Sequence, residues 1–114
     1  MATKILGRFY FKRTRNGNLV GEFSNDHSDR VSTESSDLLP GESGDNQGAY
    51  NGSYHSTWQE NGNSFFAHLN ISPAVRSKCL FRLEWRDKSA NGKLLFKGEG
   101  MLCDDILIGD YQSA

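Results

Sequence analysis

Apolar residues recur at every second position through most of segment 78–111, and this period constrains the fold more than any other feature of the chain. A period of two is typical of a β-strand that buries one face. The polar loop 87–92, which ends in Asn-Gly, separates two such series. They are Cys79, Phe81, Leu83 and Trp85, followed by Leu94, Phe96, Gly98, Gly100 and Leu102. The segment therefore predicts consecutive antiparallel strands.

Burial also predicts how these strands pair, because a slip of one residue would place apolar side chains opposite charged ones. Across loop 87–92 we expect Trp85 to lie opposite Leu94 and Leu83 to lie opposite Phe96. With these partners, all the apolar residues share one face.

A tight hairpin at 104–105 continues the same sheet. A two-residue loop there pairs Leu102 with Leu107 and Gly98 with Tyr111, so the apolar faces agree again. Three strands that agree in register predict an antiparallel meander.

The Asn-Gly pair at 61–62 is the strongest hairpin signal in the chain. It predicts that Trp58 lies opposite Phe65 on the inward face. On the outward face it places His55 opposite His68. The strand before this turn is expected to begin near residue 48.

The N-terminal segment predicts a further hairpin, with strands over 7–14 and 19–24. A three-residue loop at 16–18 places Phe11 opposite Phe23, and both then face inward. After these strands the pattern weakens.

Residues 31–34 are a short strand candidate, and 35–47 have no hydrophobic period. Because this second segment also contains a proline and two glycines, we expect a long loop. Leu38 and Leu39 would cap one end of the core, as a portal or lid does.

No helical period occurs, so the fold class is all-β, and 1–114 is expected to form a single domain. Short strands separated by turns favour a sandwich or a barrel. A meander of roughly eight strands closes into an up-and-down barrel if 106–112 pairs with 7–14. Closure would remove both sheet edges.

In this respect the chain resembles the calycin barrels, which include lipocalins, fatty-acid-binding proteins and avidins. The resemblance rests on three stretches: Gly7-Arg8-Phe9-Tyr10, the run from Gly48-Ala49-Tyr50 to Ser56-Thr57-Trp58, and 96–111. The lipocalin opening motif has Trp where Phe9 stands. The resemblance implies an antiparallel barrel with an internal pocket, and it does not identify a ligand.

The charge balance argues against nucleic acid and membranes as partners, because the formal net charge is -1. No apolar run has the length of a membrane span, and no signal peptide is recognisable, so a cytoplasmic protein is expected. The two cysteines, Cys79 and Cys103, fall on opposite faces of neighbouring strands. Free thiols are therefore expected, as in a reducing compartment.

Most of the aromatic residues would face inward, and this leaves two interpretations. Large rings can simply fill an eight-stranded barrel, or they can line a cavity for a small apolar or aromatic ligand. The second interpretation makes the protein a non-catalytic binding module. Its candidate ligand-binding residues are Tyr50, Tyr54, Trp58, Phe81, Trp85, Phe96 and Tyr111.

No catalytic constellation, metal site or cofactor is predicted, and an enzyme is not expected. His55 and His68 would lie opposite each other, but no carboxylate or thiol completes a metal site, and Arg82 is expected near His68. Glu99 and Asp110 also lie opposite each other, on the outer face, where a surface charge network is expected. We expect no acid or base in the interior.

An outward apolar band provides the alternative function. Such a band marks an interface, unless the long loop covers part of it. In this interpretation the core is filled, and the protein acts through its surface as an interaction partner or a homodimer. The candidate interface residues are Leu80, Met101, Ile106 and Ile108, with Leu95 further along.

Overall fold

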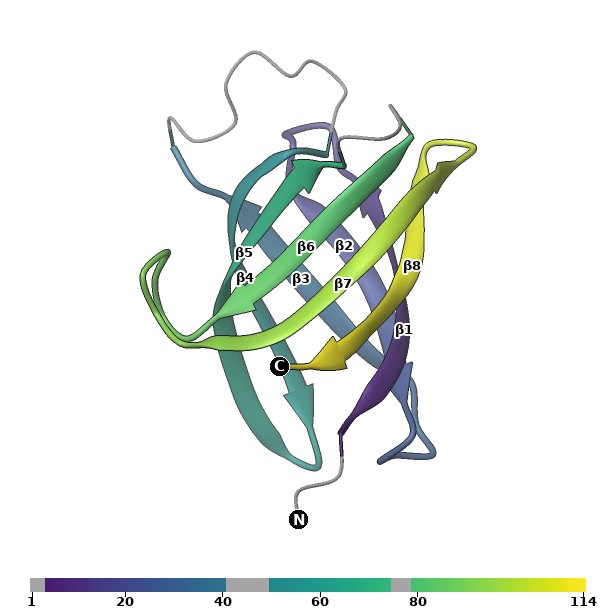
Figure 1. Cartoon of the computed structure of the whole chain (residues 1–114), viewed down its shortest axis with the longest axis vertical. Coiled ribbons are helices and arrows are strands. Elements are labelled where there is room, and N and C mark those ends of the chain that lie inside the picture. Colours follow the sequence, from purple (N-terminus) through teal and green to yellow (C-terminus); the bar gives the residue numbers. More distant parts are fainter. Residues whose placement is uncertain (1–3, 41–49, 75–78) are drawn as a thin grey trace.

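The structure, a computed structural model, describes residues 4–40, 50–74 and 79–114, and within them every regular element is a β-strand. Each strand pairs antiparallel with the next, and the last pairs with the first, so the sheet closes into a barrel (Figure 1). This confirms the predicted eight-stranded meander and its closure. The strands are β1 (Leu6–Arg13), β2 (Leu19–Asn25), β3 (Ser32–Leu38), β4 (Gly52–Glu60), β5 (Asn63–Pro73), β6 (Leu80–Arg86), β7 (Leu94–Cys103) and β8 (Ile106–Ser113).

The two tight turns have the predicted registers. Trp58 lies opposite Phe65 across the β4–β5 turn, and Leu102 lies opposite Leu107 across the β7–β8 turn. Both central residues of each turn have positive φ, with 52° and 81° at 61–62. Two positive φ angles give the turn a twist that matches the right-handed twist of the two strands. Asn-Gly and Asp-Asp therefore predict a two-residue hairpin turn with this geometry.

The β1–β2 register differs from the prediction by two residues. Phe9, rather than Phe11, lies opposite Phe23, and the connecting loop is 14–18. Within the loop, the Thr14 amide donates to the Asn18 carbonyl oxygen at 2.7 Å. The predicted faces are still correct, because a two-residue slip returns every side chain to the same side of the sheet.

The β6–β7 register also differs by two residues. Trp85 lies opposite Phe96 and Leu83 opposite Gly98, and a β-bulge follows Trp85. The bulge inserts Leu95 as an extra residue, and its side chain packs against the core instead of joining the outer band.

The strand β3 is longer than the sequence predicts. Residues 35–38, which we expected to belong to a long loop, continue the strand that begins at Ser32. The inward residues of β3 include Glu34 and Ser36, both buried, and Leu38 at its end is the only apolar residue of the strand, so there is almost no hydrophobic alternation to reveal it. The rest of the predicted loop, 41–47, lies outside the described residues.

The inward side chains form one continuous hydrophobic core inside the barrel. Phe65, which we expected to face inward, is 42% exposed at the β4–β5 end. The buried core residues are Phe9, Phe11, Leu19, Phe23, Tyr50, Tyr54, Trp58, Ala67, Leu69, Ile71, Phe81, Leu83, Trp85, Leu107 and Tyr111.

Tyr50 seals one end of the barrel. Its hydroxyl lies 2.9 Å from the carbonyl oxygen of Phe11 and 2.7 Å from that of Asp105, and it donates its proton between them. The Tyr54 hydroxyl donates in turn to the Tyr50 carbonyl oxygen at 2.6 Å. The start of β1, the end of β8 and the β4–β5 turn lie at the opposite end (Figure 1).

Candidate functional site

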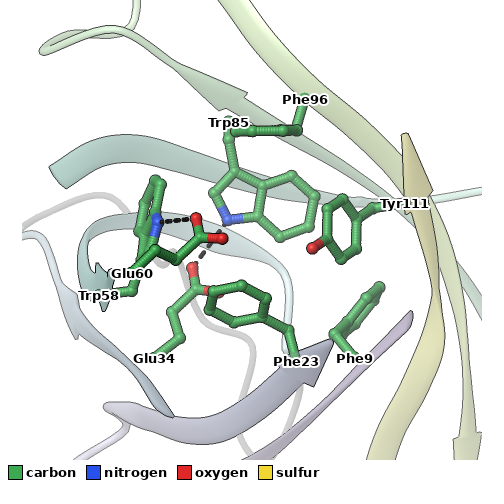
Figure 2. Close-up of a pocket in the computed structure, with 8 residues that line it drawn as sticks. All are labelled: Phe9, Phe23, Glu34, Trp58, Glu60, Trp85, Phe96 and Tyr111. Carbon is green, nitrogen blue, oxygen red and sulfur yellow. Dashed lines mark hydrogen bonds between the residues drawn. The ribbon is translucent and has the colours of Figure 1, made fainter. Parts of the chain in front are cut away.

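A small pocket lies inside the barrel, and Tyr50 is not part of its lining. Figure 2 shows the side chains that line it. Six aromatic side chains and two carboxyl groups line it, and they come from seven of the eight strands. Its cavity has a volume of about 20 Å³, enough for one water-sized group. The lining residues are Phe9, Phe23, Glu34, Trp58, Glu60, Trp85, Phe96 and Tyr111.

Glu34 is the buried polar group of this pocket, with only 5% of its surface exposed. The indole Nε1 of Trp85 donates to its Oε2 at 2.8 Å, and the Ser56 hydroxyl donates to the same oxygen. The Ser36 hydroxyl lies 2.8 Å from that of Ser56 and extends the network. Gly21 and Trp58 flank Glu34 in the sheet.

Burial raises the pKa of Glu34 from 4.5 to about 7. Loss of hydration is the main cause, because it disfavours the charged carboxylate. The hydrogen bonds from Ser56 and Trp85 oppose this shift, and the nearby charge of Glu60 adds to it. Near neutral pH the group therefore exchanges readily between its neutral and charged forms.

The second carboxyl, Glu60, lies at the last position of β4. The indole Nε1 of Trp58 donates to its Oε1 at 3.1 Å. Figure 2 shows the two indole nitrogens turned toward the two carboxyl groups. Among the residues that the structure describes, the lining thus carries two acidic groups and no basic side chain.

The aromatic rings pack mostly edge to face, an arrangement that suits their quadrupoles. Trp85 meets Phe9 with ring centroids 5.9 Å apart and planes at 80°. At the mouth, by contrast, Phe65 stacks on Trp58 with centroids 5.9 Å apart and planes at 19°. An exposed ring stacked on a lining ring makes a platform beside the pocket.

Tyr111 closes the wall formed by β8. Its hydroxyl accepts a hydrogen bond from the Asn25 side-chain nitrogen at 3.0 Å. Burial raises the pKa of Tyr111 to about 12, so this group is neutral at physiological pH.

The candidate ligand-binding residues divide between the two ends of the barrel. Four of them, Trp58, Trp85, Phe96 and Tyr111, line the pocket. The other three, Tyr50, Tyr54 and Phe81, pack in the core away from it, and both tyrosine hydroxyls bond to backbone oxygens there.

Sequence reasoning missed the central group of the site. The expectation that the interior contains no acid or base is wrong, because Glu34 lies inside the barrel. The inward position of Glu34 could have been predicted only from closure of the barrel. If β3 is part of a closed sheet, one of its two mostly polar faces must point inward.

The histidine pair lies as expected, with His55 opposite His68. Arg86, rather than Arg82, is the β6 residue opposite His68. No group of three or more His, Cys, Asp or Glu side chains able to hold a metal occurs in the described part of the chain. Glu99 lies opposite Asp110 on the outer face, as expected.

Neither cysteine forms a disulfide bond, as predicted. Cys79 is exposed just before β6, however, and not inward as its position in the apolar series predicted.

The outer apolar band forms a row across three neighbouring strands. Met101 lies opposite both Leu80 and Ile108, and Ile106 follows on β8. Met101 is 54% and Ile108 43% exposed, whereas Leu80 and Ile106 are half-buried. Tyr10 of β1 lies opposite Ile108 and continues the row.

No family model matches the chain, and neither a curated protein nor a solved structure does. Among the described residues, none forms a helix with the length and hydropathy needed to cross a membrane.

Proposed function

We propose that this protein is a non-catalytic binding module of the calycin-barrel type, which holds a small, partly apolar ligand at the open end of the barrel. The observation that supports this most is the pocket itself: six aromatic rings surround a buried, hydrogen-bonded carboxyl group. Pockets of this kind combine apolar walls with a few polar groups that orient a ligand.

The cavity volume of about 20 Å³ limits how a ligand binds. A water-sized polar group of the ligand enters the cavity, and its apolar body rests on the platform of Trp58 and Phe65 at the mouth. A recognition role for Glu34 follows, because a reacting bond in the body of a larger substrate would remain too far from a carboxyl at this depth.

Native mass spectrometry of freshly purified protein is the first test. A mass above that of the denatured chain, lost on denaturation, supports the proposal and gives the mass of the ligand. A bare mass leads to a second test with added aromatic probes such as benzyl alcohol.

Both tryptophans of the chain lie in the pocket, so their two indole N–H resonances report on it without interference from other sites. We expect probe binding to shift both resonances in a titration. Phe65→Ala removes the platform and should weaken binding several-fold. The neighbouring Phe66→Ala is the matched control, because Phe66 is equally exposed but belongs to the outer face. Equal losses in the two variants would contradict the proposed site.

The outer band supports a second candidate function, association with a partner or a second copy. Met101 and Ile108 are adjacent, exposed and apolar, a combination that is uncommon on a free surface. We expect Ile108→Glu to convert a homodimer to a monomer in light scattering. A protein that is monomeric before the substitution, or an oligomer that persists after it, contradicts the homodimer.

A cytoplasmic location belongs to the same proposal. Two cysteines without a disulfide bond support a reducing compartment.

A further inference from the structure

We propose that the pocket selects an organic cation, a primary ammonium group on an apolar or aromatic body, with the ammonium held in the cavity beside Glu34. The inference rests on the proposed function and specifies the chemical class of its ligand. Charge, ring electrostatics and cavity size support it independently.

The charge of the lining favours a cation. Glu34 and Glu60 both contribute carboxyl groups, and none of the other lining residues is basic. In a site removed from water, a cation gains more from these carboxylates than it would in solvent. An anionic ligand would be repelled by the same groups, and its own hydration would be lost without compensation.

The aromatic rings of the lining also favour a cation. A ring carries negative charge on its faces, so an ammonium group within about 6 Å of a ring centroid is attracted. Tryptophan provides the strongest such attraction, and both tryptophans of the chain line this cavity. A purely apolar ligand would use the rings but would leave the Glu34 carboxyl buried without a new partner.

The cavity size selects the type of ammonium. A volume of about 20 Å³ accommodates a group the size of water, and a primary ammonium is of that size. A trimethylammonium group is larger and would displace the packed rings. The three N–H bonds of a primary ammonium also match the two carboxyl groups and leave one donor for water at the mouth.

Few titratable groups surround Glu34, so its protonation controls binding directly. The neighbouring strand β4 contributes Glu60, and β8 contributes Tyr111, which stays neutral. The other neighbour, β2, presents Gly21 and Phe23 inward, and β6 presents Trp85. A pKa of about 7 for Glu34 means that its cation-binding form is lost on acidification.

Benzylamine and benzyl alcohol are suitable probes, because they have nearly the same shape and differ in charge. With the intact protein at pH 8, we expect benzylamine to bind about 10- to 100-fold more tightly, the range that a charged hydrogen bond contributes. Its affinity should fall about tenfold per pH unit from 7 to 5, whereas that of benzyl alcohol changes little. Benzoate should not bind.

Glu34→Gln should abolish the preference for benzylamine. Asp37→Asn is the matched control, because it removes an exposed carboxylate from the outer face of the same strand and should leave the preference intact. If Glu34→Gln fails to fold, the pH dependence of benzylamine affinity in the unmodified protein tests the inference: an affinity that does not fall from pH 7 to 5 overturns it.

The outcomes separate this inference from the proposed function. If neither probe shifts the indole resonances, the proposed function fails. If both bind with equal affinity, or if a folded Glu34→Gln variant still prefers benzylamine, the binding module stands and the cation inference is overturned.

Discussion

The burial of Glu34 has a direct consequence for how stability depends on pH. Its pKa is about 7 in the folded barrel, against 4.5 for an ordinary glutamate. Folding therefore takes up a proton at this site between pH 4.5 and 7. The contribution of Glu34 to the free energy of unfolding is fully present below pH 4.5, falls as the pH rises through this window, and stays low above it.

The size of this effect follows from the pKa shift. Each pH unit of difference corresponds to about 1.4 kcal/mol, so ionisation of Glu34 costs the folded state about 3 kcal/mol by pH 8. Glu34 is 5% exposed, so solvent screening does not reduce this figure much. Against a typical domain stability of about 5–15 kcal/mol, this is a large fraction.

Urea denaturation of the wild type and Glu34→Gln from pH 4 to 8 measures the effect. The glutamine cannot ionise, so we expect the variant to gain about 3 kcal/mol relative to the wild type across this range. That gain corresponds to a relative shift of roughly 1–3 M in the urea midpoint. Other titrating groups contribute to both curves and cancel in the difference.

Asp37→Asn provides the control, because Asp37 lies on the outer face of β3 and is exposed. Its difference curve should be nearly flat. Parallel profiles for the wild type and Glu34→Gln would refute the reasoning, because they would mean that Glu34 is not desolvated in the folded state.

Two further predictions concern the framework of the barrel. Tyr50→Phe removes the hydroxyl that bonds to two backbone oxygens at the far end of the barrel. We expect the free energy of unfolding, measured by urea denaturation, to fall by about 1–3 kcal/mol, and probe binding at the opposite end to remain unchanged. A loss of binding would contradict the separation of the two ends. Gly109→Ala places a Cβ 1.9 Å from the Glu99 carbonyl oxygen and should destabilise or unfold the protein, as measured by thermal melting. Gly62→Ala meets nothing within 4 Å and should cost only about 1 kcal/mol for its positive φ of 81°, so equal losses at the two glycines would contradict the steric argument.

The polar strand β3 shows why part of the site escaped sequence analysis. Secondary structure was predictable wherever apolar and polar residues alternate, as in Phe81, Leu83 and Trp85. In β3 both faces are polar apart from Leu38 at its end, so the period-two signal is absent although the strand is present. Because this signal is absent, the sequence did not predict that Glu34 is buried. The environment of Glu34 comes from side chains on other strands.

The two-residue errors in register have a different origin. A slip of two residues keeps every side chain on its own face, so hydrophobicity cannot distinguish the two pairings. The turn residues predicted the correct strand register at 61–62 and 104–105, because a two-residue loop allows one geometry. At the longer loops 14–18 and 87–93 the turn residues do not specify the register.

The sequence by itself determined the all-β class, the faces of the alternating strands and the two tight turns, because these depend on local periodicity and on the φ that each turn requires. The tertiary structure alone decided that Glu34 is buried, that it lies against Trp85 of a distant strand, and that the cavity beside it is the size of one water. These properties depend on closure of the barrel, which brings together side chains far apart in the chain and removes their water. The shifted pKa and the chemistry of the pocket follow from that removal.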